Sequence, residues 1–176
     1  TIIRPDAGRI VMQEAAEPPM RRFNLVPEWQ VTTDRDAMFR QLDSDTFDYS
    51  RTVLLETAPE LPSGTMPELQ PEVTLLESFV NSASLRVTTP DPCVLLVTDA
   101  WHSGWSVRGA WNGADMDYIV QPADYALMGI PLRAGRHELE LRYTPLGFKT
   151  GGIVSGVGVM LLCGLMIRYG SVRKKV

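Results

Sequence analysis

The sequence predicts a mainly β protein, with an antiparallel β-sandwich or jelly-roll-like outer domain, a small N-terminal α+β unit and one C-terminal transmembrane helix. Seven short β-rich stretches follow one another within residues 72–148, and turn sequences separate them. Regular spacing of this kind is typical of two-sheet antiparallel folds. A glycine-rich apolar stretch then runs from Gly151 to Ile167 without a charged residue. Its length and composition favour a membrane-spanning helix.

Residues 1–56 are expected to form the small α+β unit. Thr33 is expected to cap a helix that carries two acidic residues in its first turn. Residues 57–71 contain four prolines and are expected to form a linker. The expected elements of the unit are strands at residues 9–13, 23–26 and 51–56 and a helix at residues 34–42.

Residues 72–148 are expected to form the β-sandwich. The dipeptide Asn112-Gly113 is the strongest hairpin signal, because both central residues of a type I′ turn need positive φ. Residues 137–143 alternate between apolar and charged side chains, which indicates a strand that is buried on one face. The expected strands are residues 73–80, 84–88, 93–98, 105–111, 118–121, 125–131 and 137–143.

Charge is divided sharply along the chain. Residues 1–148 hold all 21 acidic residues and 12 arginines, a net charge of −9, whereas residues 149–176 hold five basic residues and no acid. An outer domain this acidic cannot neutralise a run of phosphates, so no nucleic acid partner is expected. A disulfide between Cys93 and Cys163 is not expected, because Cys163 lies in the apolar stretch. The chain starts without a Met or a signal-like segment and is expected to be part of a longer polypeptide.

We expect residues 149–169 to cross a membrane as a helix. Its seventeen uncharged residues would span roughly 25 Å, slightly less than a hydrocarbon core of about 30 Å. Lys149 and Arg168 flank the stretch and can extend their charged groups to the two interfaces. A buried core helix is the alternative, but five glycines in seventeen positions are unfavourable in a soluble helix.

Basic residues set the expected orientation of this helix. Arg173, Lys174 and Lys175 lie in the tail of residues 170–176, and such clusters remain in the cytoplasm. Residues 1–148 would then face the periplasm or the cell exterior. Gly152 and Gly156 form a GxxxG pattern that could pack on another helix, although glycine-rich membrane segments also match it by chance.

Several motifs follow one another in the second half of the chain. The turn "WHSGW", from Trp101 to Trp105, is followed by the Asn112-Gly113 hairpin and then by "PLRAGRHELELRYTPLGF", from Pro131 to Phe148. This order resembles the C-terminal end of the YfhO-like bacterial membrane proteins. The earlier segments "RRFNLVPEWQV" and "DSDTFDYSRTVLLE" resemble what precedes the sandwich in that family. Asn112 stands where aspartate is usual there, and "PAD" at residues 122–124 also departs from the pattern.

The resemblance implies a large multi-pass parent protein, similar to membrane glycosyltransferases of the GT-C type that use lipid-linked sugars. In such enzymes the catalytic carboxylate lies in an early outer loop, so this chain would be a non-catalytic accessory domain that shapes acceptor or glycan handling. Its expected partners are the lipid bilayer, the parent's upstream transmembrane helices and a glycan or lipid-linked sugar, with no cofactor. The alternative is a non-enzymatic, membrane-anchored interaction or assembly module.

Asp99, Trp101 and His102 are the candidate glycan contacts. Tryptophan faces stack on sugar C–H groups, and a carboxylate accepts hydrogen bonds from sugar hydroxyls. The alternative is a turn whose aromatic residues cap the core, and for Trp101 and His102 both interpretations stay open. Trp105 begins an alternating strand and is expected in the core. Gly104 is expected to supply a backbone geometry that other residues resist.

Other polar groups give no metal or catalytic prediction. The two histidines have no pair of cysteines with which to bind zinc, and His137 is expected to pack or to lie at an edge. The acids of "DSDTFD", at residues 43–48, lack the glycine and the final glutamate of a calcium loop. Asp115 and Asp117 lie just past a hairpin tip, where nothing is expected to raise a carboxyl pKa.

Overall fold

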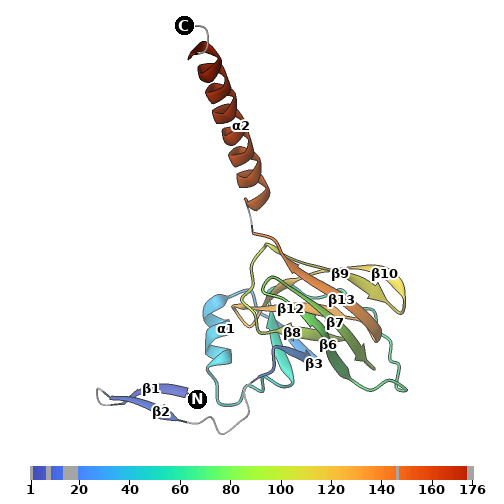
Figure 1. Ribbon diagram of the computed structural model, residues 1–176. Helices are drawn as coiled ribbons and strands as arrows, with labels where there is room; N and C mark the ends of the chain where they lie inside the picture. The colour runs from blue at the N-terminus through green and yellow to red at the C-terminus, as the bar shows by residue number, and fades with distance from the viewer. Residues whose placement is uncertain (1, 7–8, 14–19, 146, 174–176) are drawn as a thin grey trace.

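The computed structural model describes the backbone of residues 2–6, 9–13, 20–145 and 147–173, and the side chains of residues 20–145, 147–148, 151–164 and 166. Two sheets make up the main body (Figure 1). The N-terminal strands β1 (Ile2–Asp6) and β2 (Arg9–Gln13) form a separate antiparallel hairpin, and β2 has the bounds that the sequence predicted.

The first sheet has five strands, and all its pairings are antiparallel. Side chains of β13 alternate between buried and exposed along the strand, as its sequence predicted. The buried set, which includes Leu139 and Leu141, faces the second sheet and joins the main core. In spatial order the strands are β10 (Ala114–Tyr118), β9 (Trp105–Trp111), β13 (Gly135–Tyr143), β7 (Ser82–Thr89) and β6 (Glu72–Ser78).

The second sheet has six strands and is mixed. All five residues of β8 are buried, because the side chains on its two faces pack in two different hydrophobic clusters. Cys93, Leu95 and Val97 face the core between the sheets, whereas Val94 and Leu96 face a second cluster. In spatial order the strands are β3 (Phe23–Val26), β8 (Cys93–Val97), β12 (Leu127–Leu132), β11 (Gln121–Ala123), β5 (Thr52–Leu55) and β4 (Glu28–Val31).

The structure differs from the expectation of a separate unit over residues 1–56. Strands β3, β4 and β5 belong to the same sheet as β8, β11 and β12. The second cluster explains this, since Val26 and Val53 are buried there against the outer face of β8. Helix α1 (Arg35–Leu42) connects the parallel strands β4 and β5, and its Met38 is buried.

Two local expectations were wrong. The N-cap of α1 is Asp34 and not Thr33: the Asp34 carboxylate accepts the N–H of Asp36 at 3.0 Å. A carboxylate caps a helix well because it also meets the positive end of the helix dipole. Strand β10 begins at Ala114, directly after the Asn112-Gly113 turn, whereas the sequence had predicted that this strand would cover residues 118–121. A two-residue hairpin loop requires its second strand to start at once.

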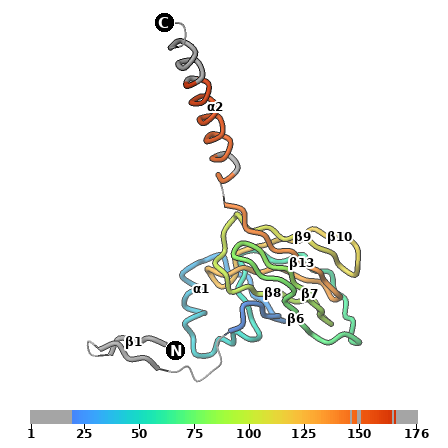
Figure 2. Tube along the Cα trace, in the orientation of Figure 1, coloured from blue at the N-terminus to red at the C-terminus, as the bar shows by residue number. Residues whose placement is uncertain are grey.

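Helix α2 (Phe148–Arg173) extends away from both sheets (Figures 1 and 2), and its described side chains are exposed. Within the described residues, no helix combines the length and apolar character needed to cross a membrane. The flanking residues predicted for such a span lie outside the described side chains. These residues are Lys149, Arg168, Arg173, Lys174 and Lys175.

Gly109 lies in the middle of β9 and pairs with Leu139 of β13. A Cβ atom at this position would lie 1.9 Å from the carbonyl oxygen of Glu138. That oxygen belongs to the backbone of the central strand and cannot move without disturbing the ladder. The two strands therefore approach each other at a distance that only glycine permits.

We predict that Gly109→Ala lowers the free energy of unfolding by about 2–4 kcal/mol, because the added methyl group must push two paired strands apart. Gly64→Ala is the control, since a Cβ atom there would meet nothing within 4 Å. Urea denaturation followed by circular dichroism measures both. Equal stabilities of the two variants would contradict the prediction.

Candidate functional site

The candidate site lies where β8 ends and its chain turns toward β9. Thr98 still pairs with the N-terminal segment, since its N–H donates to the Arg22 carbonyl at 3.0 Å. The next residues, from Asp99 to Gly104, leave the sheet and form a loop before β9 begins at Trp105. The loop therefore presents its side chains at one end of the sandwich.

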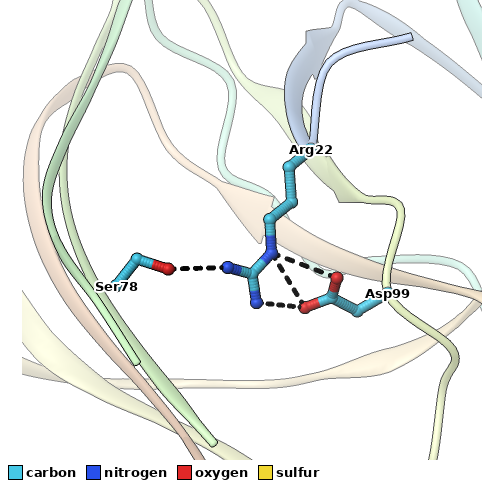
Figure 3. Close-up of polar contacts among 3 residues, drawn as sticks. All are labelled: Arg22, Ser78 and Asp99. Carbon is cyan, nitrogen blue, oxygen red and sulfur yellow. Dashed lines mark hydrogen bonds and ion pairs between the residues drawn. The ribbon is translucent and has the colours of Figure 1, made fainter. Parts of the chain in front are cut away.

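Asp99 is held by Arg22 in a bidentate ion pair (Figure 3). Nη2 of Arg22 donates to Oδ2 at 2.6 Å, and Nε lies 3.1 Å from each carboxylate oxygen. Nη1 of the same guanidinium donates to the hydroxyl of Ser78 at 3.0 Å. The planar guanidinium thus joins the ends of β8 and β6, which belong to different sheets.

Trp101 and His102 follow on the same loop. The N–H of Trp101 donates to the Ala126 carbonyl at 2.7 Å, which fixes the backbone while the side chain remains 40% exposed. His102 is exposed, and its Nδ1 accepts the N–H of Gly104 at 3.0 Å. Its ring meets the Tyr143 ring edge-on, at 5.6 Å between centroids. The three predicted contact residues are therefore on one surface, with Asp99 already paired.

Gly104 and Trp105 complete the turn. Gly104 does not have positive φ; a Cβ atom there would lie 2.6 Å from the Thr144 carbonyl oxygen. Close packing against the end of β13, and not an unusual backbone conformation, is therefore the reason for this glycine. Trp105 is half-buried, packs against the main core and lies 5.2 Å from the Tyr143 ring. The sequence predicted a core residue, and the structure has Trp105 packed against the core without being fully buried.

The Asn112-Gly113 turn lies away from this loop, at the far end of β9. Both residues have positive φ, at 49° and 85°, as the predicted type I′ turn requires. The Asn112 side-chain oxygen also accepts the N–H of Arg136 at 2.9 Å, which ties the hairpin to the start of β13. These two residues therefore have a structural role.

Two surface hollows lie elsewhere. One of about 650 Å³ lies on the five-stranded sheet and is lined partly by Arg108, Asp117, Glu138 and Glu140. A smaller one lies beside α1 and β5. Neither is lined by the candidate contact residues. In the described part of the chain, no three His, Cys, Asp or Glu side chains are arranged to hold a metal ion.

His137 is fully buried between two polar partners. Its Nε2 lies 2.9 Å from the Arg133 carbonyl oxygen and can only donate there. Its Nδ1 is then an acceptor 2.8 Å from the hydroxyl of Tyr118, whose single proton it shares with the Ala110 carbonyl oxygen at 3.1 Å. Burial lowers the pKa of His137 and raises the pKa of Tyr118 to about 12, so both groups are neutral. The pair is a satisfied element of the core, in line with the packing role expected for His137.

Asp124 is a buried carboxyl group that the sequence analysis missed. Its Oδ1 accepts the N–H of Leu54 at 2.8 Å, and its own N–H donates to the Leu54 carbonyl at 2.9 Å. Burial raises the pKa of Asp124 to about 6. Asp124 and Tyr125 both have positive φ, and the Tyr125 ring packs against Phe39 of α1. The available signal was the sequence "ADY" between two strands, because aspartate tolerates the left-handed region.

Comparison of the chain with protein-family models, with curated proteins and with solved structures finds no match. The resemblance to the YfhO-like proteins therefore stays a prediction from the sequence.

We predict opposite behaviour for the two tryptophans of the loop. Trp105→Ala should lower the free energy of unfolding by about 2–4 kcal/mol, because it removes a ring that packs on the core and on Tyr143. Trp101→Ala should change it by less than about 1 kcal/mol, as for other exposed side chains. Urea denaturation monitored by circular dichroism compares them. A large loss in Trp101→Ala would show that the whole loop belongs to the core.

We also predict a pH effect at Asp124. The folded protein holds this proton more tightly than the unfolded chain does, since the pKa rises from 3.8 to about 6. This proton therefore contributes to the free energy of unfolding. The contribution is fully present below the pKa of 3.8 that the carboxyl group has in the unfolded chain, and it is lost as the pH rises through about 6. Asp124→Asn cannot ionise, so its stability relative to the unchanged protein should increase between pH 4 and pH 7. A difference between the two proteins that is constant over this range, measured by urea denaturation, would contradict the prediction.

Proposed function

We propose that this chain is an extracytoplasmic β-sandwich module that its C-terminal helix holds in a membrane. We further propose that it is the accessory domain of a multi-pass protein similar to membrane glycosyltransferases, in which it shapes glycan or acceptor handling. The observation that carries the proposal is the surface of α2. Large apolar side chains such as Ile153, Val154 and Met160 are each more than 65% exposed, and the sandwich does not cover them.

The cost of leaving such a helix in water is large. A side chain the size of Val, Leu, Ile or Met gains about 1.5–3 kcal/mol when it is removed from water. At least eight such residues of α2 are exposed between Ile153 and Met166. The helix therefore gains many kcal/mol from an apolar environment, and lipid provides one around its whole circumference.

The charge pattern supports an orientation for this anchor. All acidic residues precede the helix, and the tail of residues 170–176 carries three basic residues. Basic residues remain on the cytoplasmic side of a membrane helix. The sandwich then faces the periplasm or the cell exterior, where the acceptor side of a glycosyl transfer reaction would lie.

In this proposal the loop after β8 contacts the glycan. Trp101 is 40% exposed, and His102, the next residue of the loop, is also exposed. Arg22 keeps Asp99 in place, so the Asp99 carboxylate would support the loop. It would accept hydrogen bonds from sugar hydroxyls only on the side that does not face Arg22.

The alternative is a non-enzymatic interaction or assembly module, and one observation favours it. A Cβ atom at Gly152 or at Gly156 would meet nothing within 4 Å, so the small-residue face of α2 is open. A second helix could approach closely along that face.

Flotation with vesicles tests the anchor. We expect the whole chain to float with phosphatidylcholine vesicles and to resist extraction by high salt, whereas a chain that ends at Gly147 should remain in the soluble fraction. Salt resistance matters because an electrostatic contact with lipid would be screened. A whole chain that stays soluble while it is folded by circular dichroism would refute the membrane part of the proposal.

The sequence of the whole encoded polypeptide would separate the two functions. A series of hydrophobic spans with an aspartate or glutamate in the first outer loop would support the glycosyltransferase-like parent. A soluble or single-span upstream region would support the interaction module instead.

A further inference from the structure

One end of the sandwich gathers loops from both sheets around the point where the chain leaves for α2. We call it the exit end and define it by the turn of residues 79–81, the loop of residues 99–104 and the end of β13 at Tyr143. The N–H of Tyr143 donates to the Asn81 carbonyl at 2.8 Å, and the N–H of Thr144 donates to the Gly104 carbonyl at 2.9 Å.

The Arg22 guanidinium links two further segments of the exit end to each other. It binds Asp99 of the loop and Ser78 at the base of the turn, so these two segments cannot separate freely (Figure 3). The exit end is therefore one surface, although its parts are far apart in the sequence.

Large apolar side chains protrude from this surface. Val80 is 102% exposed and Phe79 is 63% exposed, at the tip of a turn that the Phe79 N–H closes by donating to the Ser82 carbonyl at 2.8 Å. Trp101 is exposed on the neighbouring loop. Turns that face water carry small and polar residues, so a Phe-Val tip is unfavourable there.

The opposite end of the sandwich has a different character. Its turns lie at residues 89–92, 112–113 and 133–134, as the strand pairings show. Among the described residues of these turns, no large hydrophobic side chain is exposed. The apolar tips are therefore specific to the end from which α2 leaves.

The start of α2 must lie close to the exit end. Four residues separate Tyr143 from Phe148. Even when fully extended, this connection reaches only roughly 18 Å. A membrane that receives α2 would consequently lie within reach of the exit end. Arg21 is exposed next to Arg22, and it would favour contact with anionic headgroups in an otherwise acidic domain.

We propose that the exit end rests on the lipid surface, with Phe79, Val80 and Trp101 inserted at the boundary between headgroups and acyl chains. The inference rests on the proposed membrane anchor and adds a second contact to it. Aromatic and aliphatic side chains are stable at this boundary because their apolar atoms leave water while polar neighbours remain hydrated. The contact would hold the loop of residues 99–104 at the height of a lipid-linked substrate.

A fluorescent label at the tip tests this contact. Val80→Cys and Asp91→Cys are each prepared in the whole chain with Cys163→Ser, labelled with NBD and placed in vesicles of phosphatidylcholine and phosphatidylglycerol. Asp91 is exposed at the opposite end and serves as the matched control. Cys93 will not react, because it is buried and its thiol pKa is raised to about 11. A doxyl group near the headgroup end of the lipid acyl chain is the quencher.

We expect a blue shift and the loss of most NBD fluorescence at position 80, with neither effect at position 91. Adding Phe79→Asp should restore the fluorescence at position 80 while the chain still floats with the vesicles. Flotation without quenching at position 80 would overturn this inference and leave the anchor intact, including the case in which another protein covers the tip. Failure to float would overturn both.

Discussion

The whole fold depends on the complete burial of β8. A strand with apolar side chains on both faces must bury both of them, and residues from different regions of the chain pack with each face. The five-stranded sheet covers one face. Residues from β3 and β5, more than 35 positions earlier in the sequence, contribute to the cluster on the other face. The N-terminal region is therefore part of the sandwich, and the loop that begins at Asp99 starts from a rigid strand.

Local chemistry made much of the fold predictable from the sequence. The alternation of β13 and the Asn112-Gly113 turn each act within a few residues, so their signals are present in the sequence itself. The membership of β3 to β5 in the second sheet was not predictable, because the pairing of β3 with β8 joins residues about 70 positions apart. Strand β4 was missed for a related reason: its partner β5 is parallel and lies beyond a helix.

The candidate site was predictable in composition but not in its surroundings. The sequence placed Asp99, Trp101 and His102 on one loop, and the structure has them there. It gave no indication that Arg22 binds Asp99 across 77 positions, or that the turn at Phe79 lies beside the loop. Those relations arise only when the ends of two sheets meet. The same limit explains Asp124, whose backbone partner Leu54 is 70 positions away.

The narrow junction between β5 and β11 has a consequence for the dynamics of the molecule. The two strands pair at a single position, Ala123 with Leu55, and the paired hydrogen bonds of Asp124 with Leu54 extend that junction. Other neighbouring strands in this sheet share three to five paired positions. Opening of the segment from β4 through α1 to β5 would therefore break few backbone pairings, and its cost would lie mainly in exposing buried side chains such as Met38, Val53 and Leu55. Native-state hydrogen exchange of this segment would register how firmly side-chain packing alone holds it to the sheet.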